Sequence, residues 1–167
     1  MLKVENSSHK MNFQRKKFIF SIVGFIVLFT IDQYIKFLFV DGFEAKGECI
    51  SLVLAYNYGV AFSMFAFLQE YLKFIQIAIM VGGIIYLILN KDVFDLYYIP
   101  TTLLLAGGIS NIVDRFIHGG VVDYVYWHCG FDFAIFNLAD VLIDIAVVLI
   151  LYISYQNDKK EKQIKEA

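Results

Sequence analysis

Residues 18–40 read FIFSIVGFIVLFTIDQYIKFLFV, an apolar run long enough to cross a bilayer as one helix. Asp32, Gln33 and Lys36 lie toward its far end. A charged or strongly polar group in hydrocarbon is disfavoured, so intramembrane carboxylates usually face a protein interior or a wet cavity and usually serve a function. The stretch therefore predicts a membrane helix that carries part of a functional site.

The composition extends the membrane interpretation to the whole chain. Hydrophobic residues make up 59% of the 167 residues and the mean hydropathy is +0.65, whereas soluble proteins are about 45 to 50% apolar. At about 20 residues per span the chain has room for roughly four spans, so we expect one membrane domain over 1–167. The net charge of −2 does not supply the basic face that nucleic acid requires, which excludes nucleic acid as a partner.

Four segments are predicted to span the membrane, at about 18–40, 61–89, 97–114 and 133–155. Basic residues are concentrated in the two tails, and Lys91 lies in the link between the second and third segments. Positively charged flanks stay in the cytoplasm, so both termini are expected there. The connections 41–58 and 115–132 are then expected on the extracytoplasmic side.

The two outer connections differ in pattern. Residues 43–60 include an alternation of side-chain character along 48–56, which predicts strands of a small extracytoplasmic sheet. The connection that contains Asp123 follows a Gly-Gly break, and we expect a loop or helix that folds back over the site. The predicted fold class is therefore membrane α-helical, with four transmembrane helices, a small sheet and this covering segment.

Polar residues of three segments are expected at one depth. A helix rises about 1.5 Å per residue, so Asp32, Asn111 and Asp140 each lie roughly 21 to 22 Å from the cytoplasmic start of their helices. In a hydrocarbon layer of about 30 Å this is the outer third, within reach of water from outside. A purely structural layer of interhelical hydrogen bonds is the alternative interpretation.

Two aspartates from different segments have the chemistry of an acid–base pair. Asn137, Asp140 and Asp144 share one face of the last span, because they are three and four residues apart. One possibility is that Asp123 approaches Asp140 and the two share a proton. Such a pair hydrolyses amides through water, with no covalent intermediate or metal.

Five blocks of the sequence, in this order and topology, resemble the bacterial lipoprotein signal peptidase family, signal peptidase II. They are Asp32-Gln33-x-x-Lys36, Asn57-x-Gly59-Val60-Ala61-Phe62, Gly108-x-x-Asn111-x-x-Asp114-Arg115, Val121-Val122-Asp123 and Phe136-Asn137-Leu138-Ala139-Asp140. The resemblance covers nearly the whole chain. It implies an aspartyl endopeptidase of the bacterial inner membrane that removes signal peptides from prolipoproteins, cutting just before a diacylglyceryl-modified cysteine.

The resemblance also implies roles for individual residues. Asp123 and Asp140 would be the catalytic aspartates. The other matched positions would bind or orient the substrate and the pair (Asn57, Asn111, Arg115 and Asn137) or support the architecture of the site (Asp32, Lys36 and Asp114). It implies no metal or other cofactor, and prolipoproteins and membrane lipid as partners. We expect the protein to act as a monomer.

Two other function classes are alternatives. Asp140 and Asp144 could ligate Mg²⁺ or Mn²⁺ in a membrane phosphoalcohol transferase, since these metals prefer carboxylates. The buried carboxylates could instead relay protons or ions in a small carrier.

Several residues admit more than one interpretation. Arg115 is expected either to reach the headgroups or to pair with Asp114. Asp144 could bond a hydroxyl group of a neighbouring span, raise the pKa of Asp140 by repulsion, or be neutral. Cys49 and Cys129 are both expected outside, where a disulfide can form. A zinc site of Cys129 with the neighbouring histidines would lack ligands at suitable spacing.

Overall fold

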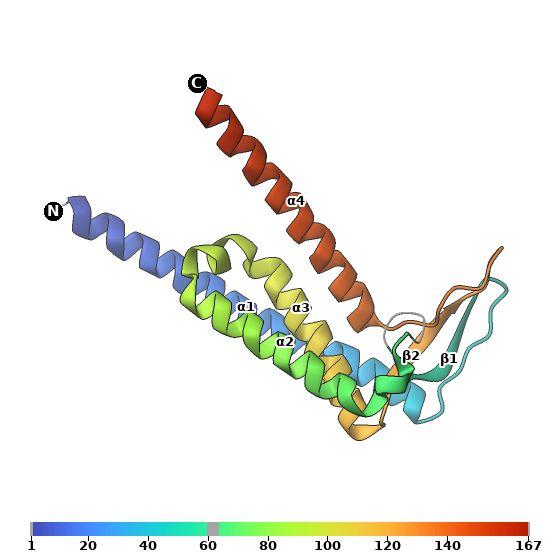
Figure 1. The fold of residues 1–167 in the computed structure, drawn as a ribbon. Coiled ribbons are helices and arrows are strands. Elements are labelled where there is room, and N and C mark those ends of the chain that lie inside the picture. Colours follow the sequence, from blue (N-terminus) through green and yellow to red (C-terminus); the bar gives the residue numbers. More distant parts are fainter. Residues whose placement is uncertain (1, 60–63, 167) are drawn as a thin grey trace.

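The computed structural model describes residues 2–59 and 64–166 (Figure 1). Within this part of the chain, the helices that are long and apolar enough to cross a bilayer are α1 (Leu2–Val40), α2 (Gln69–Leu89), α3 (Lys91–Ile117) and α4 (Leu138–Glu166). Their outer faces carry large exposed apolar side chains such as Ile79, Leu89 and Val148, as contact with lipid requires. The predicted multi-pass helical architecture is confirmed.

The helix boundaries differ from the predicted spans. α1 and α4 extend into the terminal tails, and a short 3-10 helix, η2 (Ala66–Leu68), precedes α2. The predicted start of the second span, residue 61, lies outside the described residues. α3 begins at Lys91, but its backbone leaves helical geometry at Tyr97, where φ is −108° and ψ is 19°. Pro100 explains this interruption, because a proline cannot donate to the fourth residue before it and its ring crowds that residue's carbonyl.

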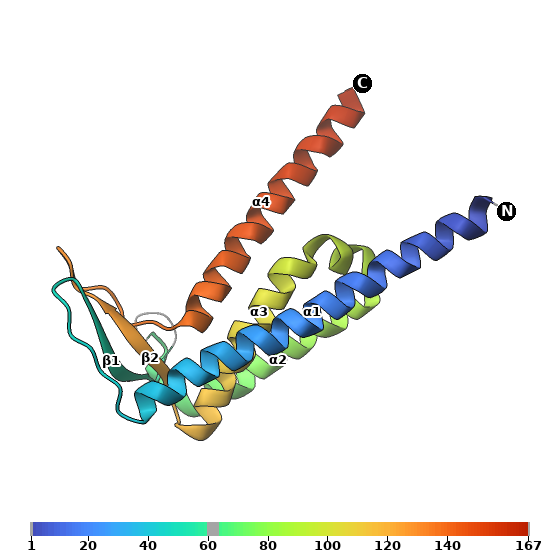
Figure 2. The ribbon, with the colours of Figure 1, turned by 180° about the vertical axis from the view of Figure 1, so that it is seen from behind.

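α3 is the central helix and contacts α1, α2 and α4. A glycine allows α4 to approach it closely. A Cβ atom built on Gly107 would lie only 2.5 Å from the carbonyl oxygen of Ala139, in the first turn of α4. Away from this contact α4 diverges from the other three helices (Figures 1 and 2). Small residues at such crossings let two backbones come together.

The described residues form one sheet, in which β1 (Ile50–Asn57) pairs antiparallel with β2 (Val121–Trp127). The register joins Ile50 to Trp127 and Asn57 to Val121, with an irregularity between Leu52 and Ala55. Figure 2 shows this sheet at the end of the helices opposite to both termini. The sheet therefore sits over the end of the bundle where α3 stops and α4 starts.

The sheet confirms the strand predicted in the connection 41–58 and corrects the prediction for the connection 115–132. β1 covers 50–57 of the predicted 43–60, Ala45 adds an isolated bridge to Leu52, and residue 60 lies outside the described residues. The segment expected as a loop or helix over the site is strand β2 instead. Its sequence, VVDYVYW, is rich in β-branched and aromatic residues, which favour a strand.

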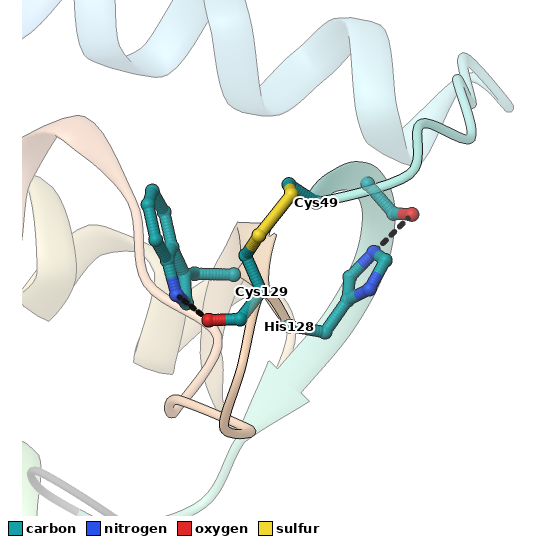
Figure 3. The surroundings of a disulfide bond; sticks show 5 residues. Cys49, His128 and Cys129 are labelled. Carbon is teal, nitrogen blue, oxygen red and sulfur yellow. Dashed lines mark hydrogen bonds between the residues drawn. A yellow bond between two sulfur atoms is a disulfide. The ribbon is translucent and has the colours of Figure 1, made fainter.

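Cys49 and Cys129 form a disulfide at the far end of the sheet (Figure 3). Cys49 precedes β1 and Cys129 follows β2, 80 residues later in the chain. Beside the bond, His128 Nε2 lies 2.9 Å from Ser51 Oγ, and Trp127 Nε1 donates to the Cys129 carbonyl at 3.2 Å. Cys129 and His128, considered above as zinc ligands, are thus engaged in holding the two strand ends together.

The close contact at Gly107 predicts a specific loss of stability. Gly107→Ala should lower the free energy of unfolding by about 1 to 3 kcal/mol, because the added methyl group forces α4 away from α3. Gly82→Ala in α2 is the matched control, since no atom lies within 4 Å of its added Cβ and alanine favours a helix over glycine by about 1 kcal/mol. Thermal unfolding of both variants in one detergent measures the difference. Wild-type stability of Gly107→Ala would contradict the packing argument.

Candidate active site

A buried lysine links α1 to α3. Lys36 Nζ lies 2.8 Å from Asp32 Oδ2 and 2.7 Å from Asp114 Oδ2, and it also donates to Asn111 Oδ1 at 2.8 Å. Lys36, Asp32 and Asp114 are all buried. Charges taken out of water are tolerated only when they are paired and their remaining polar atoms are hydrogen-bonded. This network is therefore expected to be sensitive to the loss of any one member.

The carboxylates of Asp32 and Asp114 accept further hydrogen bonds. Ser110 Oγ donates to Asp32 Oδ2 at 2.5 Å, and Gln33 Nε2 donates to Asp114 Oδ1 at 2.9 Å. The backbone N–H of Val122, in β2, donates to Asp114 Oδ2 at 3.2 Å. Asp114 thus positions the strand that carries Asp123.

The N-terminus of α4 is held by side chains. The first three N–H groups of a helix have no partner within it, and here each finds an acceptor: Leu138 donates to Tyr124 at 3.0 Å, Ala139 to Asp32 at 2.9 Å, and Asp140 to Asn137 at 2.8 Å. In return the Asn137 backbone N–H donates to Asp140 Oδ2 at 3.2 Å. This reciprocal pair is a capping box, so the Asn-x-x-Asp spacing also determines where α4 begins.

Asn137 is bonded to both of the aspartates expected to be catalytic. Its side-chain Nδ2 donates to Asp123 Oδ1 at 2.7 Å, while its backbone donates to Asp140. Asn111 Nδ2 donates to the other oxygen of Asp140, Oδ1, at 2.9 Å. Residues from β2, α3 and the start of α4 therefore meet around one buried asparagine.

Asp123 has an unusual proton affinity. Burial and the negative charge of Asp140 raise its pKa to about 7, against the opposing effects of hydrogen bonds from Asn57 and Asn137 and of the Lys36 charge. Asp123 as a whole residue is only 2% exposed. A carboxylic acid with this pKa retains a proton close to neutral pH, which is what a general acid requires.

A cavity of about 430 Å³ opens beside Asp140. Its size and its mixture of apolar and polar walls suit a ligand such as a short peptide. The polar part of the wall comes from both the helices and β1, and the apolar part mainly from the segment before α4. The lining includes Asn57, Asn111, Arg115, Asp140, Phe133 and Ile135.

Arg115 behaves differently from both expectations. It is 4% exposed and so does not reach the headgroups, and Asp114 pairs with Lys36 instead. The guanidinium Nε donates to Gln76 Oε1 at 3.1 Å, and Nη2 donates to the Gly59 carbonyl oxygen. Through these two hydrogen bonds Arg115 links the end of α3 to α2 and to the chain just after β1.

The residues that the sequence assigned to the site lie together in the structure. Four further residues contribute and were not assigned a role: Gln33, Gln76, Ser110 and Tyr124. Gln33 and Gln76 carry a usable signal, because each is an amide inside an apolar span. Tyr124 carries none, since the chain has 11 tyrosines and its role depends on the strand that brings its hydroxyl to α4.

Comparison with known proteins identifies the family of this chain. The family described as signal peptidase (SPase) II matches residues 24–156. The chain belongs to the signal peptidase II family. This places it among the peptidases and does not favour the phosphoalcohol transferase or the ion carrier considered above.

Several curated proteins are similar over most of the chain. A lipoprotein signal peptidase of Wolinella succinogenes is 54% identical over 135 residues, which cover 81% of this chain and 92% of that protein. One from Sulfurimonas denitrificans is 58% identical over 129 residues, covering 77% and 83%. One from Helicobacter pylori is 44% identical over 151 residues, covering 90% and 96%.

A solved structure shares the fold. A bacterial membrane enzyme structure at 2.3 Å resolution superposes with a TM-score of 0.72 and 25% sequence identity, covering 85% of this chain and 90% of that one. The resemblance inferred from five short blocks is confirmed, and the protein is an aspartic endopeptidase of the signal peptidase II family that removes signal peptides from prolipoproteins.

The buried network predicts which lysine matters for stability. Lys36→Met should lower the free energy of unfolding by about 3 to 5 kcal/mol, because Asp32 and Asp114 would remain buried without a counter-charge. Lys73→Met is the control. Lys73 pairs with Glu70 at 4.0 Å, and the Glu70 side chain is 80% exposed, so its loss should cost less than about 1 kcal/mol. Unfolding in the same detergent compares the variants, and equal losses would contradict the argument.

Proposed function

We propose that this signal peptidase cuts its substrate with a water molecule activated between Asp123 and Asp140. The observation that carries the proposal is the double role of Asn137, which donates its side chain to one aspartate and its backbone N–H to the other. Membership of the family supplies the reaction class. The raised pKa of Asp123 supports a division of labour between the two acids.

In this mechanism Asp140 is the general base and Asp123 the general acid. Ionised Asp140 takes a proton from water as the water oxygen attacks the scissile carbonyl carbon. Asp123 gives its proton to the carbonyl oxygen, which forms a neutral tetrahedral intermediate. When the C–N bond breaks, the proton on Asp140 passes to the leaving amine and the hydroxyl proton returns to Asp123.

A chain of hydrogen bonds orients the base. Lys36 donates to Asn111 Oδ1, and Asn137 Nδ2 donates to the same oxygen at 3.2 Å. With its oxygen occupied, the Asn111 amide must present its N–H to Asp140, as the 2.9 Å bond has it. Hydrogen bonds to the charged form favour a carboxylate. Lys36 and Asn111 therefore act as positioning residues for Asp140.

The substrate we propose is a prolipoprotein with a diacylglyceryl-modified cysteine. The printed name of the relatives, lipoprotein signal peptidase, supports the class of substrate. In this proposal the cavity beside Asp140 receives the residues around the cut bond, while the acyl chains stay in the surrounding bilayer. One copy of the chain carries both aspartates, and we propose that it acts as a monomer.

We place the site near the extracytoplasmic face, with both termini in the cytoplasm. Two observations support this orientation. Basic residues are concentrated in the tails, which stay inside when positively charged. The sheet at the opposite end holds the Cys49–Cys129 disulfide, and disulfides persist in oxidising compartments. A lipid-modified cysteine at the outer leaflet would then meet the aspartates at matching height.

Removal of either acid tests the mechanism. Asp123→Asn and Asp140→Asn should lower the rate of precursor cleavage by at least about 10²-fold, the scale of general acid–base catalysis, while the precursor still binds. Asp158→Asn, an exposed position of α4, is the matched control and should cleave like wild type. The assay uses purified protein with lipid-modified precursor. Substantial cleavage by either active-site variant would refute the pair.

The pKa of Asp123 predicts the pH profile. Because the folded-state pKa is raised to about 7, the acid holds its proton below that pH and loses it above. We therefore expect kcat/KM to fall as pH rises through about 7, with a tenfold loss per pH unit on the alkaline side. Initial rates between pH 5.5 and pH 9 on the lipid-modified precursor measure this. A rate that increases steadily to pH 9 would contradict the acid role of Asp123.

A further inference from the structure

Asp144 is a carboxylate that the catalytic mechanism does not use. It lies four residues after Asp140 on α4, lines the same cavity, and is an exposed residue. Among residues 14–59 and 64–164, whose side chains the structure describes, no side chain donates a hydrogen bond to it or forms an ion pair with it. The hydroxyl partner from a neighbouring span, considered above, is not found among these residues.

An unpartnered carboxylate at this depth is costly. Polar groups in a membrane span are disfavoured unless they face a wet cavity or a partner. Asp32 and Asp114 follow this rule, because Lys36 pairs with both of them. Asp144 has only the cavity, so a partner for its carboxylate is expected on the molecule that occupies the cavity.

The residues that line the cavities indicate where a bound signal peptide would lie relative to Asp144. A second cavity, of about 310 Å³, shares Gln76 and Ile143 with the first. Its wall then becomes apolar along α2 and α3, with Met80 and Leu104 among the lining residues. An apolar signal segment would lie in this second cavity while its cut end reaches Asp140. Asp144 lines the first cavity and directly follows Ile143, which lines both.

The spacing indicates which substrate residue passes Asp144. Four residues of α4 span about 6 Å at about 1.5 Å per residue. An extended peptide advances about 3.3 Å per residue, so Asp144 lies about two residues from the cut bond on the signal-peptide side. The side chains within reach are those of the second and third residues before the bond.

We propose that Asp144 is a specificity-determining residue that accepts a hydrogen bond from a serine or threonine hydroxyl at the second or third residue before the cut. A hydroxyl group donates one proton without bringing a charge, whereas a lysine side chain would have to be taken out of water as a charged group before it could pair with Asp144. The inference rests on the proposed function, because it assumes that the cavity holds a signal peptide. It adds a substrate preference that the acid–base pair alone does not give.

The experiment compares lipid-modified precursors that differ only at these two positions, carrying serine at one of them or alanine at both. Wild-type enzyme should prefer the serine precursor by about threefold to tenfold in kcat/KM, as expected for one hydrogen bond, with the difference mainly in KM. In Asp144→Ala this ratio should fall to about one. Asp158→Asn, which also loses a carboxylate from α4, should keep the wild-type ratio.

The outcomes separate this inference from the function on which it rests. Failure of wild-type enzyme to cut either precursor refutes the proposed function. Cleavage of both precursors at equal kcat/KM by wild type overturns the role of Asp144, and this comparison requires no variant to fold. A serine preference that persists unchanged in Asp144→Ala also overturns it.

Discussion

Lys36 is held between Asp32 and Asp114, and both elements that carry the proposed catalytic aspartates depend on those two carboxylates. The second oxygen of Asp32 accepts the Ala139 N–H in the first turn of α4, and Asp114 accepts the Val122 N–H of β2. One buried ion network thus positions a helix terminus and a strand at the same level. Networks of this kind are rigid when fully satisfied and costly when a member is missing.

The start of α4 combines a structural and a chemical role in the same residues. Asn137 and Asp140 cap each other's N–H groups, which gives the helix its first turn. The same arrangement leaves the Asn137 amide free to donate to Asp123 and holds Asp140 at the cavity wall. A helix N-terminus also favours negative charge nearby, which suits the role of ionised base that we propose for Asp140. The same two residues therefore cap the helix and take part in the site.

Much of this could be predicted from hydropathy and spacing. The four spans follow from apolar run length, and the meeting of Asp32, Asn111 and Asp140 follows from helical rise. Three features did not follow. Residues 121–127 were expected to be a covering loop or helix, because the sequence alone does not show that their strand partner lies 64 to 77 residues earlier in the chain. Arg115 was judged by its position at a helix end, although its partners, Gln76 and the Gly59 carbonyl, come from other segments. The start of α3 at Lys91 was missed because the polar residues around Lys91 were assigned to a link between two spans.

The covalent link between Cys49 and Cys129 has a consequence for how the molecule matures. The two cysteines flank a sheet whose strands are far apart in sequence, so both strands must be present and paired before the sulfur atoms can meet. Thiols stay reduced in the cytosol. In the proposed orientation the disulfide can therefore form only after both strands have crossed the membrane, and protein synthesised under reducing conditions would lack this covalent link between the two strand ends.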